Sequence, residues 1–380
     1  MSKGINIGLD GVARKIKKLN VGVDGVARKV KKAWYGVDGV ARLIYSGQSE
    51  VSYYGTITPL SVARYNHASA SVGNYALFAG GTISAANYVS TVDAYDTSLT
   101  RTTPTGLNTA TLSPAGATVG NYALIGGGYA KSIGSTTAVD AYDTSLTRTT
   151  PTALSIKRYN TTALTVGDYA LFAGGQTDAG AKYITTAVDA YDTSLTRTTP
   201  TALSLARAKL SSATVGSYGL VVGGYNRDGD PDDTVDAYDT SLTRTTPTAL
   251  SAANYKVRSA SVGNYALFAG GYNDSTPLNI INTYDISLTR SVDAATLSVA
   301  RDYPSGASMD NYALFAGGVI GSDKSDVVDA YDTSLTRTNP ATLSVATITS
   351  PAPTVGNYAL FAGGSTSNGG TDTVQVYQVK

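Results

Sequence analysis

The stretch Val72-Gly73-Asn74-Tyr75-Ala76-Leu77-Phe78-Ala79-Gly80-Gly81 decides the fold, because nearly the same sequence is repeated along the chain. Further glycine pairs end at Gly128, Gly175, Gly224, Gly271, Gly318 and Gly364. The seven pairs are separated by 47, 47, 49, 47, 47 and 46 residues. A period in this range is typical of an architecture built by repeating one small structural unit.

Each unit reads as a set of short strands. The segment before the glycine pair is apolar on both alternating faces, which indicates a strand buried on both sides. Val92–Asp96 then alternates and leads into an Asp-Thr-Ser turn, and Arg101-Thr102-Thr103-Pro104 follows. Four strands per unit, repeated radially, predict an all-β fold of the β-propeller type, which leaves little exposed sheet edge.

The two ends of the repeat region complement each other. After Gly364 the chain supplies one more strand, Thr373–Tyr377, and reaches Lys380 without the Thr-Arg-Thr-Thr-Pro strand of the other units. A matching strand stands before the first unit, at Val51–Leu60. We expect it to pair into the seventh blade and close the ring, which removes two unpaired edges.

Residues 51–380 resemble kelch repeats. The resemblance is carried by the glycine pairs, by a Tyr-Asp pair in the third strand (Tyr95-Asp96 and its copies) and by an arginine before the first strand (Arg64, Arg158, Arg207 and Arg301). Where kelch repeats usually carry a tryptophan after Tyr-Asp, this chain has Leu99-Thr100-Arg101. The resemblance implies a seven-bladed kelch-like β-propeller whose blades pack together by another means.

Composition excludes several classes of site. The 380 residues include no cysteine and one histidine, His67, so disulfides, thiolate metal sites and imidazole zinc sites are not expected. No apolar run approaches the length of a membrane span, and the first 30 residues are interrupted by lysine and arginine. We expect no membrane insertion, no signal peptide and no cofactor.

Residues 1–50 form a second, basic repeat region with ten Lys and Arg against four Asp and Glu. The motif Gly8-Leu9-Asp10-Gly11-Val12-Ala13-Arg14-Lys15 returns from Gly22 and from Gly36, a period of 14. Each Asp-Gly between apolar residues predicts a tight hairpin, and together they suggest a small β-meander. Nucleic acid is an unlikely partner, because no aromatic platform accompanies the lysines.

This tandem motif resembles segments of tail and other structural proteins of phages and prophages of Gram-positive bacteria. The resemblance implies a virion component that is assembled in the bacterial cytoplasm and released by lysis. Residues 1–50 would then be an attachment or oligomerisation segment that docks onto other virion or tail subunits or forms a homo-oligomer.

The copies differ from one another mainly on one face of the expected ring. In a propeller the loop after the second strand and the segment entering the first strand emerge on the same side. Both vary here, as in Thr82–Thr91 against Tyr129–Ala138, whereas the loops of the opposite face stay nearly constant as Val-Gly-Asn-Tyr and Asp-Thr-Ser-Leu-Thr. The variable face reads as a binding surface. The alternative is that loops simply tolerate change.

Tyrosine, arginine, asparagine and serine dominate this variable face, and such residues are typical of recognition loops. The predicted ligand-binding residues are Tyr65, His67, Arg158, Tyr159, Tyr225, Arg227, Tyr255, Arg258, Tyr272 and Tyr303. Residues entering the first strand should lie nearest the axis and matter more than the peripheral Tyr88 and Tyr183. The tyrosines could stack on sugar rings or fill a protein epitope.

Two other kinds of site are disfavoured. The loop Asn226–Asp233 alternates side-chain oxygens as calcium loops do, but Pro231 occupies the usual glycine position and no closing glutamate follows, so a solvated acidic loop is preferred. An enzyme is disfavoured because the lone histidine has no evident acid partner and the repeated Asp93, Asp140, Asp189, Asp236 and Asp329 look like turn or strand-edge groups.

The sequence therefore predicts a phage tail or virion-surface protein that binds a host-cell surface glycan or protein. The alternative is a cytosolic kelch-type protein-interaction scaffold that uses the same face.

Overall fold

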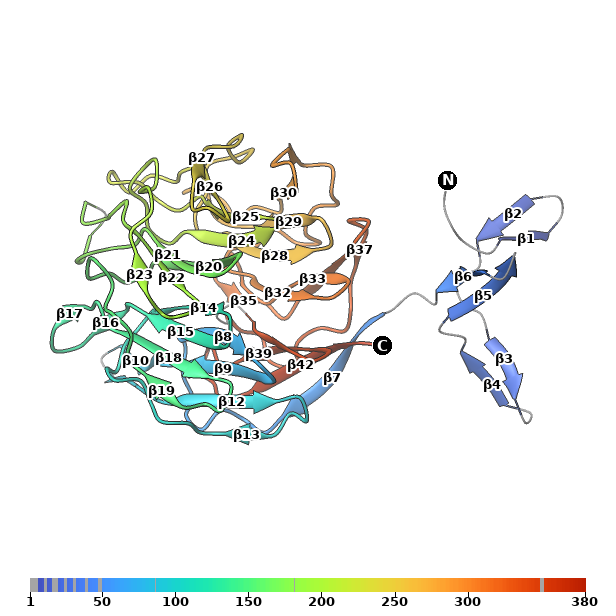
Figure 1. The fold of residues 1–380 in the computed structure, drawn as a ribbon, viewed down its shortest axis with the longest axis horizontal. Coiled ribbons are helices and arrows are strands. Elements are labelled where there is room, and N and C mark those ends of the chain that lie inside the picture. The colour runs from blue at the N-terminus through green and yellow to red at the C-terminus, as the bar shows by residue number, and fades with distance from the viewer. Residues whose placement is uncertain are drawn as a thin grey trace. The chain divides into compact units, whose positions relative to one another are not determined.

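The computed structural model describes residues 6–9, 12–15, 20–23, 26–29, 32–37, 40–46, 50–85, 87–180, 182–348 and 352–380. The chain divides into two compact units, Met1–Glu50 with Lys380 and Val51–Val379. The larger unit is an all-β propeller, and the described residues form seven four-stranded antiparallel sheets, its blades (Figure 1).

The four strands of each blade follow the repeat closely. The first strands are β8 (Ala68–Val72), β14 (Ala115–Val119), β20 (Thr162–Val166), β24 (Ser211–Val215), β28 (Arg258–Val262), β32 (Ser305–Met309) and β38 (Thr354–Val355). The second strands, which end at the glycine pairs, are β9 (Tyr75–Ala79), β15 (Tyr122–Gly126), β21 (Tyr169–Ala173), β25 (Tyr218–Val222), β29 (Tyr265–Ala269), β33 (Tyr312–Ala316) and β39 (Tyr358–Ala362).

The third strands carry the Tyr-Asp pair or its equivalent. They are β12 (Val92–Asp96), β18 (Val139–Asp143), β22 (Val188–Asp192), β26 (Val235–Asp239), β30 (Ile281–Asp285), β36 (Val328–Asp332) and β42 (Val374–Val379). The outer strands are β13 (Arg101–Thr102), β19 (Arg148–Thr149), β23 (Arg197–Thr198), β27 (Arg244–Thr245), β31 (Arg290–Ser291), β37 (Arg337–Thr338) and β7 (Val51–Ile57).

Four loops that follow a glycine pair hold small hairpins of their own. These are β10 (Thr82–Ser84) with β11 (Asn87–Tyr88), β16 (Tyr129–Ala130) with β17 (Gly134–Ser135), β34 (Val319–Ile320) with β35 (Asp323–Lys324), and β40 (Ser365–Thr366) with β41 (Gly369–Gly370).

The strand β7 closes the ring, as the sequence predicts. The seventh blade has the order β38-β39-β42-β7, so its outer strand comes from the N-terminal side of the propeller. Pairing runs from Ile57 opposite Val374 to Val51 opposite Val379, with one register shift between Val376 and Tyr377. The first and last blades are thereby joined by backbone hydrogen bonds.

Neighbouring blades pack through tyrosine and leucine in place of the missing tryptophan. Tyr142 of the second blade is fully buried among first-blade residues such as Leu77, and its hydroxyl donates to the Thr105 carbonyl at 2.8 Å. Leu146, at φ 62°, packs against the same cluster. An equivalent cluster with Tyr95 and Leu99 joins the seventh blade to the first.

The smaller unit contains hairpins, but the predicted meander is wrong. The described strands form three separate two-stranded sheets, β1 (Asn6–Leu9) with β2 (Val12–Lys15), β3 (Asn20–Val23) with β4 (Val26–Lys29), and β5 (Lys32–Val37) with β6 (Val40–Ser46). Each pairing joins the two strands that flank one Asp-Gly position, which is the sequence signal for a tight hairpin. The Asp10-Gly11, Asp24-Gly25 and Asp38-Gly39 turns lie outside the described residues.

Within the part of the chain that the structure describes, no helix is long and apolar enough to cross a membrane.

Candidate functional site

The two variable segments of each blade are joined to each other by backbone hydrogen bonds. In the first blade, Tyr65 N–H donates to the Thr82 carbonyl at 3.0 Å and Thr82 N–H donates to the Tyr65 carbonyl at 2.9 Å. Matching bridges join the entry residue to the residue after the glycine pair at Leu112–Tyr129, Tyr159–Gln176, Ala208–Tyr225, Tyr255–Tyr272, Asp302–Val319 and Ile348–Ser365. The variable segments therefore share one face, which we call the variable face.

The glycine pair makes this bridge possible. Gly175 has φ 106°, a region that other residues rarely adopt, and a Cβ there would lie 2.8 Å from the Tyr159 carbonyl oxygen. The entry segment therefore passes directly over the second glycine of the pair. The glycine pair that defines the repeat therefore also fixes the position of the residues that precede the first strand.

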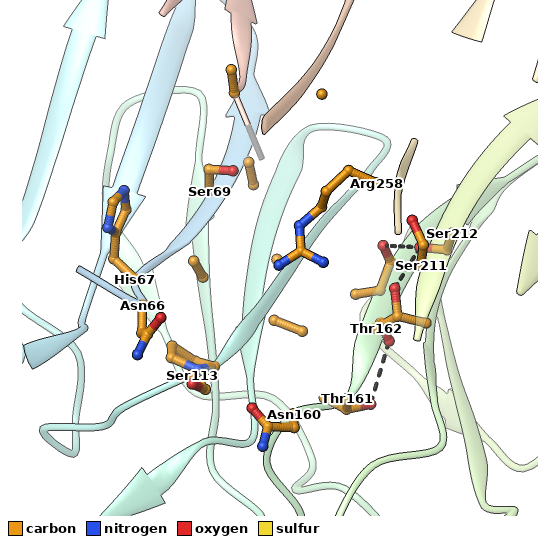
Figure 2. Close-up of a pocket in the computed structure, with 18 of the residues that line it drawn as sticks. Asn66, His67, Ser69, Ser113, Asn160, Thr161, Thr162, Ser211, Ser212 and Arg258 are labelled. Atoms are coloured by element: carbon orange, nitrogen blue, oxygen red, sulfur yellow. Dashed lines mark hydrogen bonds between the residues drawn. The ribbon is translucent and has the colours of Figure 1, made fainter. Parts of the chain in front are cut away.

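First strands of neighbouring blades contact one another around the axis and surround a central channel of about 750 Å³. Small residues make up most of its lining, and serine or threonine hydroxyls hydrogen-bond several first strands to the preceding blade. Among the lining residues, Ser71 donates to the Thr354 carbonyl at 2.8 Å and Ser259 donates to the Ser212 carbonyl at 2.5 Å. The channel wall is thus polar and internally hydrogen-bonded (Figure 2).

A ring of left-handed residues surrounds the channel at the variable face. The residue after each bridged entry position has positive φ in six copies of the described chain: Asn66, Ser113, Asn160, Lys209, Lys256 and Tyr303, at 49° to 62°. Asparagine adopts this region with little strain, whereas lysine and tyrosine do so at a cost of about 1 kcal/mol or more. The backbone of this rim is constant although its side chains differ.

Tyrosine rings gather into two groups on the variable face. The rings of Tyr88, Tyr129 and Tyr159 meet edge to face, with centroids 6.4 Å and 5.2 Å apart. Of the three residues only Tyr159 lines the channel, and Tyr88 contacts Tyr129, which also follows a glycine pair. Edge-to-face contacts hold the rings at fixed orientations, so the group offers a preformed aromatic surface.

The second group surrounds a lysine. Tyr225 contacts Tyr255, and Tyr255 contacts Tyr272, with centroids 6.3 Å and 6.0 Å apart. The Lys256 ammonium lies 4.7 Å to 5.2 Å from the ring centroids of Tyr255, Tyr272 and Tyr303. It also pairs with the Asp302 carboxylate at 2.8 Å. Desolvation acts to lower the pKa of Lys256, but the hydrogen bond to Asp302, the Asp302 charge and the nearby tyrosines together outweigh it and raise that pKa.

The predicted binding residues divide into three sets. Five line the channel, namely Tyr65, His67, Tyr159, Arg258 and Tyr303. Tyr255, Tyr272 and the exposed Arg227 stand on the variable face outside the channel lining. The third set is buried: Tyr225, which follows a glycine pair, is only 9% exposed, and Arg158 is fully buried.

Arg158 is the first correction, because it does not reach the variable face. Its side chain is fully buried and pairs with Asp189 at 2.5 Å, and it donates to the Phe172 carbonyl at 3.1 Å. Buried Arg–Asp pairs at the same place join Arg64 to Asp93, Arg207 to Asp236 and Arg301 to Asp329. These arginines hold the entry segment to the third strand.

His67 is the second correction. Only 3% of it is exposed, although it lies at the channel wall, and its ring packs edge to face against Phe78 at 5.6 Å. Burial, with a further effect of the Arg64 charge, lowers the pKa of His67 to about 3. It is therefore a neutral core residue and not a surface ligand contact.

The repeated aspartates are also deeper than expected. The sequence predicts turn or strand-edge groups, but Asp93, Asp189, Asp236 and Asp329 are fully buried and Asp140 nearly so. A comparison of the seven repeats contains the signal for this buried pairing. Where the arginine is absent, its partner changes in two of the three blades, as Asn254/Asn282 and Thr347/Gln375 show, whereas Thr111/Asp140 keeps the aspartate.

The acidic loop is organised by its own backbone. Asn226 Oδ1 accepts hydrogen bonds from the N–H groups of Asp228 and Asp230, at 2.9 Å and 3.1 Å. Asp232 Oδ1 accepts one from Thr234 N–H at 2.8 Å. Two of the four alternating side chains, Asn226 and Asp232, thus have an oxygen that accepts hydrogen bonds within the loop. No group of three metal-binding side chains occurs among the residues described.

Comparison with known proteins shows the fold alone. No protein-family model matches the chain, and no curated protein matches it. The structure is similar to a solved structure described as "Structure of YjhT", with a TM-score of 0.58 and 14% sequence identity. The match covers 74% of this chain and 99% of the other.

Proposed function

We propose that this protein is a kelch-like propeller of a virion, in its tail or on its surface, and that it binds a host-cell surface glycan or protein through the variable face. One observation carries the proposal: the backbone of the rim is the same from blade to blade, whereas its side chains are not. Positions held by the same bridge and the same positive φ carry Asn, Ser, Lys or Tyr.

This regularity argues against simple loop tolerance. Loops that vary freely usually vary in backbone as well as in sequence. The opposite face offers a direct comparison, because its turn is equally regular: Asp96 Oδ1 accepts from Ser98 and Thr100 N–H groups at 2.8 Å and 2.9 Å, and Leu99 has φ 61°. That turn keeps its sequence, whereas the equally constrained rim changes, which favours selection for binding.

The virion assignment rests on residues 1–50. Their three hairpins repeat a motif that resembles segments of phage structural proteins, and a string of small hairpins suits docking onto other virion or tail subunits or onto further copies of this chain. The protein would be assembled in the bacterial cytoplasm and leave it by lysis.

Mass spectrometry tests the location. Particles purified from the medium of the producing cells should contain peptides of this chain at a fixed ratio to the other virion proteins. Recovery only from the cytosol of unlysed cells would instead support the interaction-scaffold alternative. Excess free full-length protein should reduce adsorption of the same particles to host cells, and unchanged adsorption would count against a receptor-binding role.

A further inference from the structure

One position in the channel breaks the symmetry of the ring. The first residue of each first strand pairs with the last residue of the second strand, and in the other described copies it is small: Ala68, Ala115, Thr162, Ser211 and Ser305. In the fifth blade the same register, opposite Ala269, holds Arg258. A single guanidinium thus enters a channel that is otherwise lined by small residues at this level.

The side chain is positioned but not neutralised. Figure 2 shows Arg258 extending from its strand into the space bordered by Ser69, Asn160 and Thr161. Its guanidinium stacks on the Tyr303 ring at 4.9 Å, and Nη1 donates to the Val257 carbonyl at 3.0 Å. Nε is buried and has no hydrogen-bond acceptor in the described chain. Stacking holds the planar group while leaving donors for another partner.

The surroundings favour an anion. No aspartate or glutamate occurs among the described residues that line the channel, whereas Lys209 lines it as a second cation. Asp302 lies close by, but its carboxylate is already paired with Lys256 at 2.8 Å. Burial lowers the pKa of Arg258, yet a guanidinium stays protonated in proteins, so its charge persists.

The remaining lining suits a polyhydroxylated molecule. Asn66, Ser69, Ser113, Asn160 and Thr161 offer donors and acceptors, and Tyr65, Tyr159 and Tyr303 offer ring faces or edges. A volume of about 750 Å³ is within the usual range of small-ligand sites. We propose that the channel mouth binds the carboxylate or phosphate of an acidic sugar or polyol, with Arg258 as its charged anchor.

This inference deepens the proposed function, on which it rests in taking the ligand to be part of a surface glycan. Calorimetric titration of the full chain with glucuronate, glucose 6-phosphate, glycerol 3-phosphate and neutral glucose tests it. At least one anionic probe should bind tenfold or more tightly than glucose. Glucuronate against glucose 6-phosphate separates a carboxylate from a phosphate preference.

Arg258→Ser is the decisive variant, because serine already occupies the same register in two other blades. It should weaken the anionic probe about tenfold to a hundredfold, as expected for loss of a charged hydrogen-bond donor, and leave glucose unaffected. Arg290→Ser removes a cation of the outer strand β31, outside the channel lining, and should change affinity less than twofold. Unchanged anion binding in Arg258→Ser, or equal affinity for glucose and the anions, would overturn the inference.

The two proposals can fail separately. If the full chain blocks particle adsorption and Arg258→Ser blocks it equally well, receptor binding stands and the anion site does not. If anionic probes bind through Arg258 but the chain never affects adsorption, the site stands and the receptor function fails.

Discussion

Asp189→Asn should destabilise the propeller strongly, whereas Asp140→Asn should not. Asp189 is fully buried, 2.5 Å from the buried Arg158 and 3.2 Å from Arg197. Without its charge, the Arg158 guanidinium would stay buried, and its Nε and Nη1 already have no acceptor in the described chain. Removing one partner of a buried ion pair typically costs about 3–5 kcal/mol.

Asp140 is the matched control because its blade lacks the arginine. Thr111 occupies that place, and the nearest cation is the partly exposed Arg148 at 3.5 Å. Burial raises the pKa of Asp140, whose carboxylate accepts a hydrogen bond from the Asn108 N–H at 3.1 Å and has no buried arginine beside it in the described chain. Asparagine there loses little, so we expect a change in unfolding free energy within about 1 kcal/mol.

Urea unfolding followed by far-UV circular dichroism measures both variants. Intrinsic tryptophan fluorescence is unsuitable, since the one tryptophan, Trp34, lies in β5, outside the propeller. The double variant Arg158→Asn/Asp189→Asn copies the Asn254/Asn282 arrangement of the fifth blade and should recover most of the loss. Equal losses for Asp189→Asn and Asp140→Asn, or no recovery in the double variant, would refute the reasoning.

Three further predictions concern the ring, His67 and the hairpins. Deleting residues 1–62 removes β7 and should give aggregated protein by size-exclusion chromatography, whereas deleting 1–48 should leave a soluble propeller; equal solubility would contradict ring closure. Burial lowers the pKa of His67 from 6.5 to about 3, so the free energy of unfolding should be unaffected by this residue above pH 6.5 and should decrease as the pH falls below 6.5, by about 2 kcal/mol at pH 5. His67→Val should abolish this part of the pH dependence. A variant with the same pH profile as the wild type would show that His67 does not cause it. Light scattering should show self-association, or docking onto a tail subunit, that requires residues 1–48, and a full chain that does neither would count against the attachment role.

The propeller could be predicted because each repeat contains residues, such as the glycine pairs, that the local backbone conformation requires. Glycine pairs at a constant interval mark places where a Cβ would meet a carbonyl, as at Gly175, and the unmatched strand Val51–Ile57 could complete only one blade. The shared face of the variable loops followed from strand alternation. The glycine pairs, the closing strand and the shared face of the loops all depend on backbone geometry, which can be predicted from the types of residue in the sequence.

What the sequence could not show depends on burial of polar groups. Arg158 and Arg258 look alike in a sequence, both standing near the start of a first strand, but one is paired inside the blade and the other enters the channel. His67 and Asp93 likewise have polar side chains at positions where the packing of neighbouring blades excludes water. Only comparison between the copies, where arginine and aspartate change together, could have separated these roles.

Adsorption by paired alanine variants tests most directly whether the variable face binds the host. Tyr159 lies at the channel mouth and contacts Tyr129, whereas Asn74 is exposed on the opposite face. Particles carrying Tyr159→Ala should adsorb to host cells with an affinity lower by about 1–3 kcal/mol, the usual loss for a central tyrosine, and Asn74→Ala should adsorb like the wild type. Normal adsorption of Tyr159→Ala together with loss in Asn74→Ala would contradict the account.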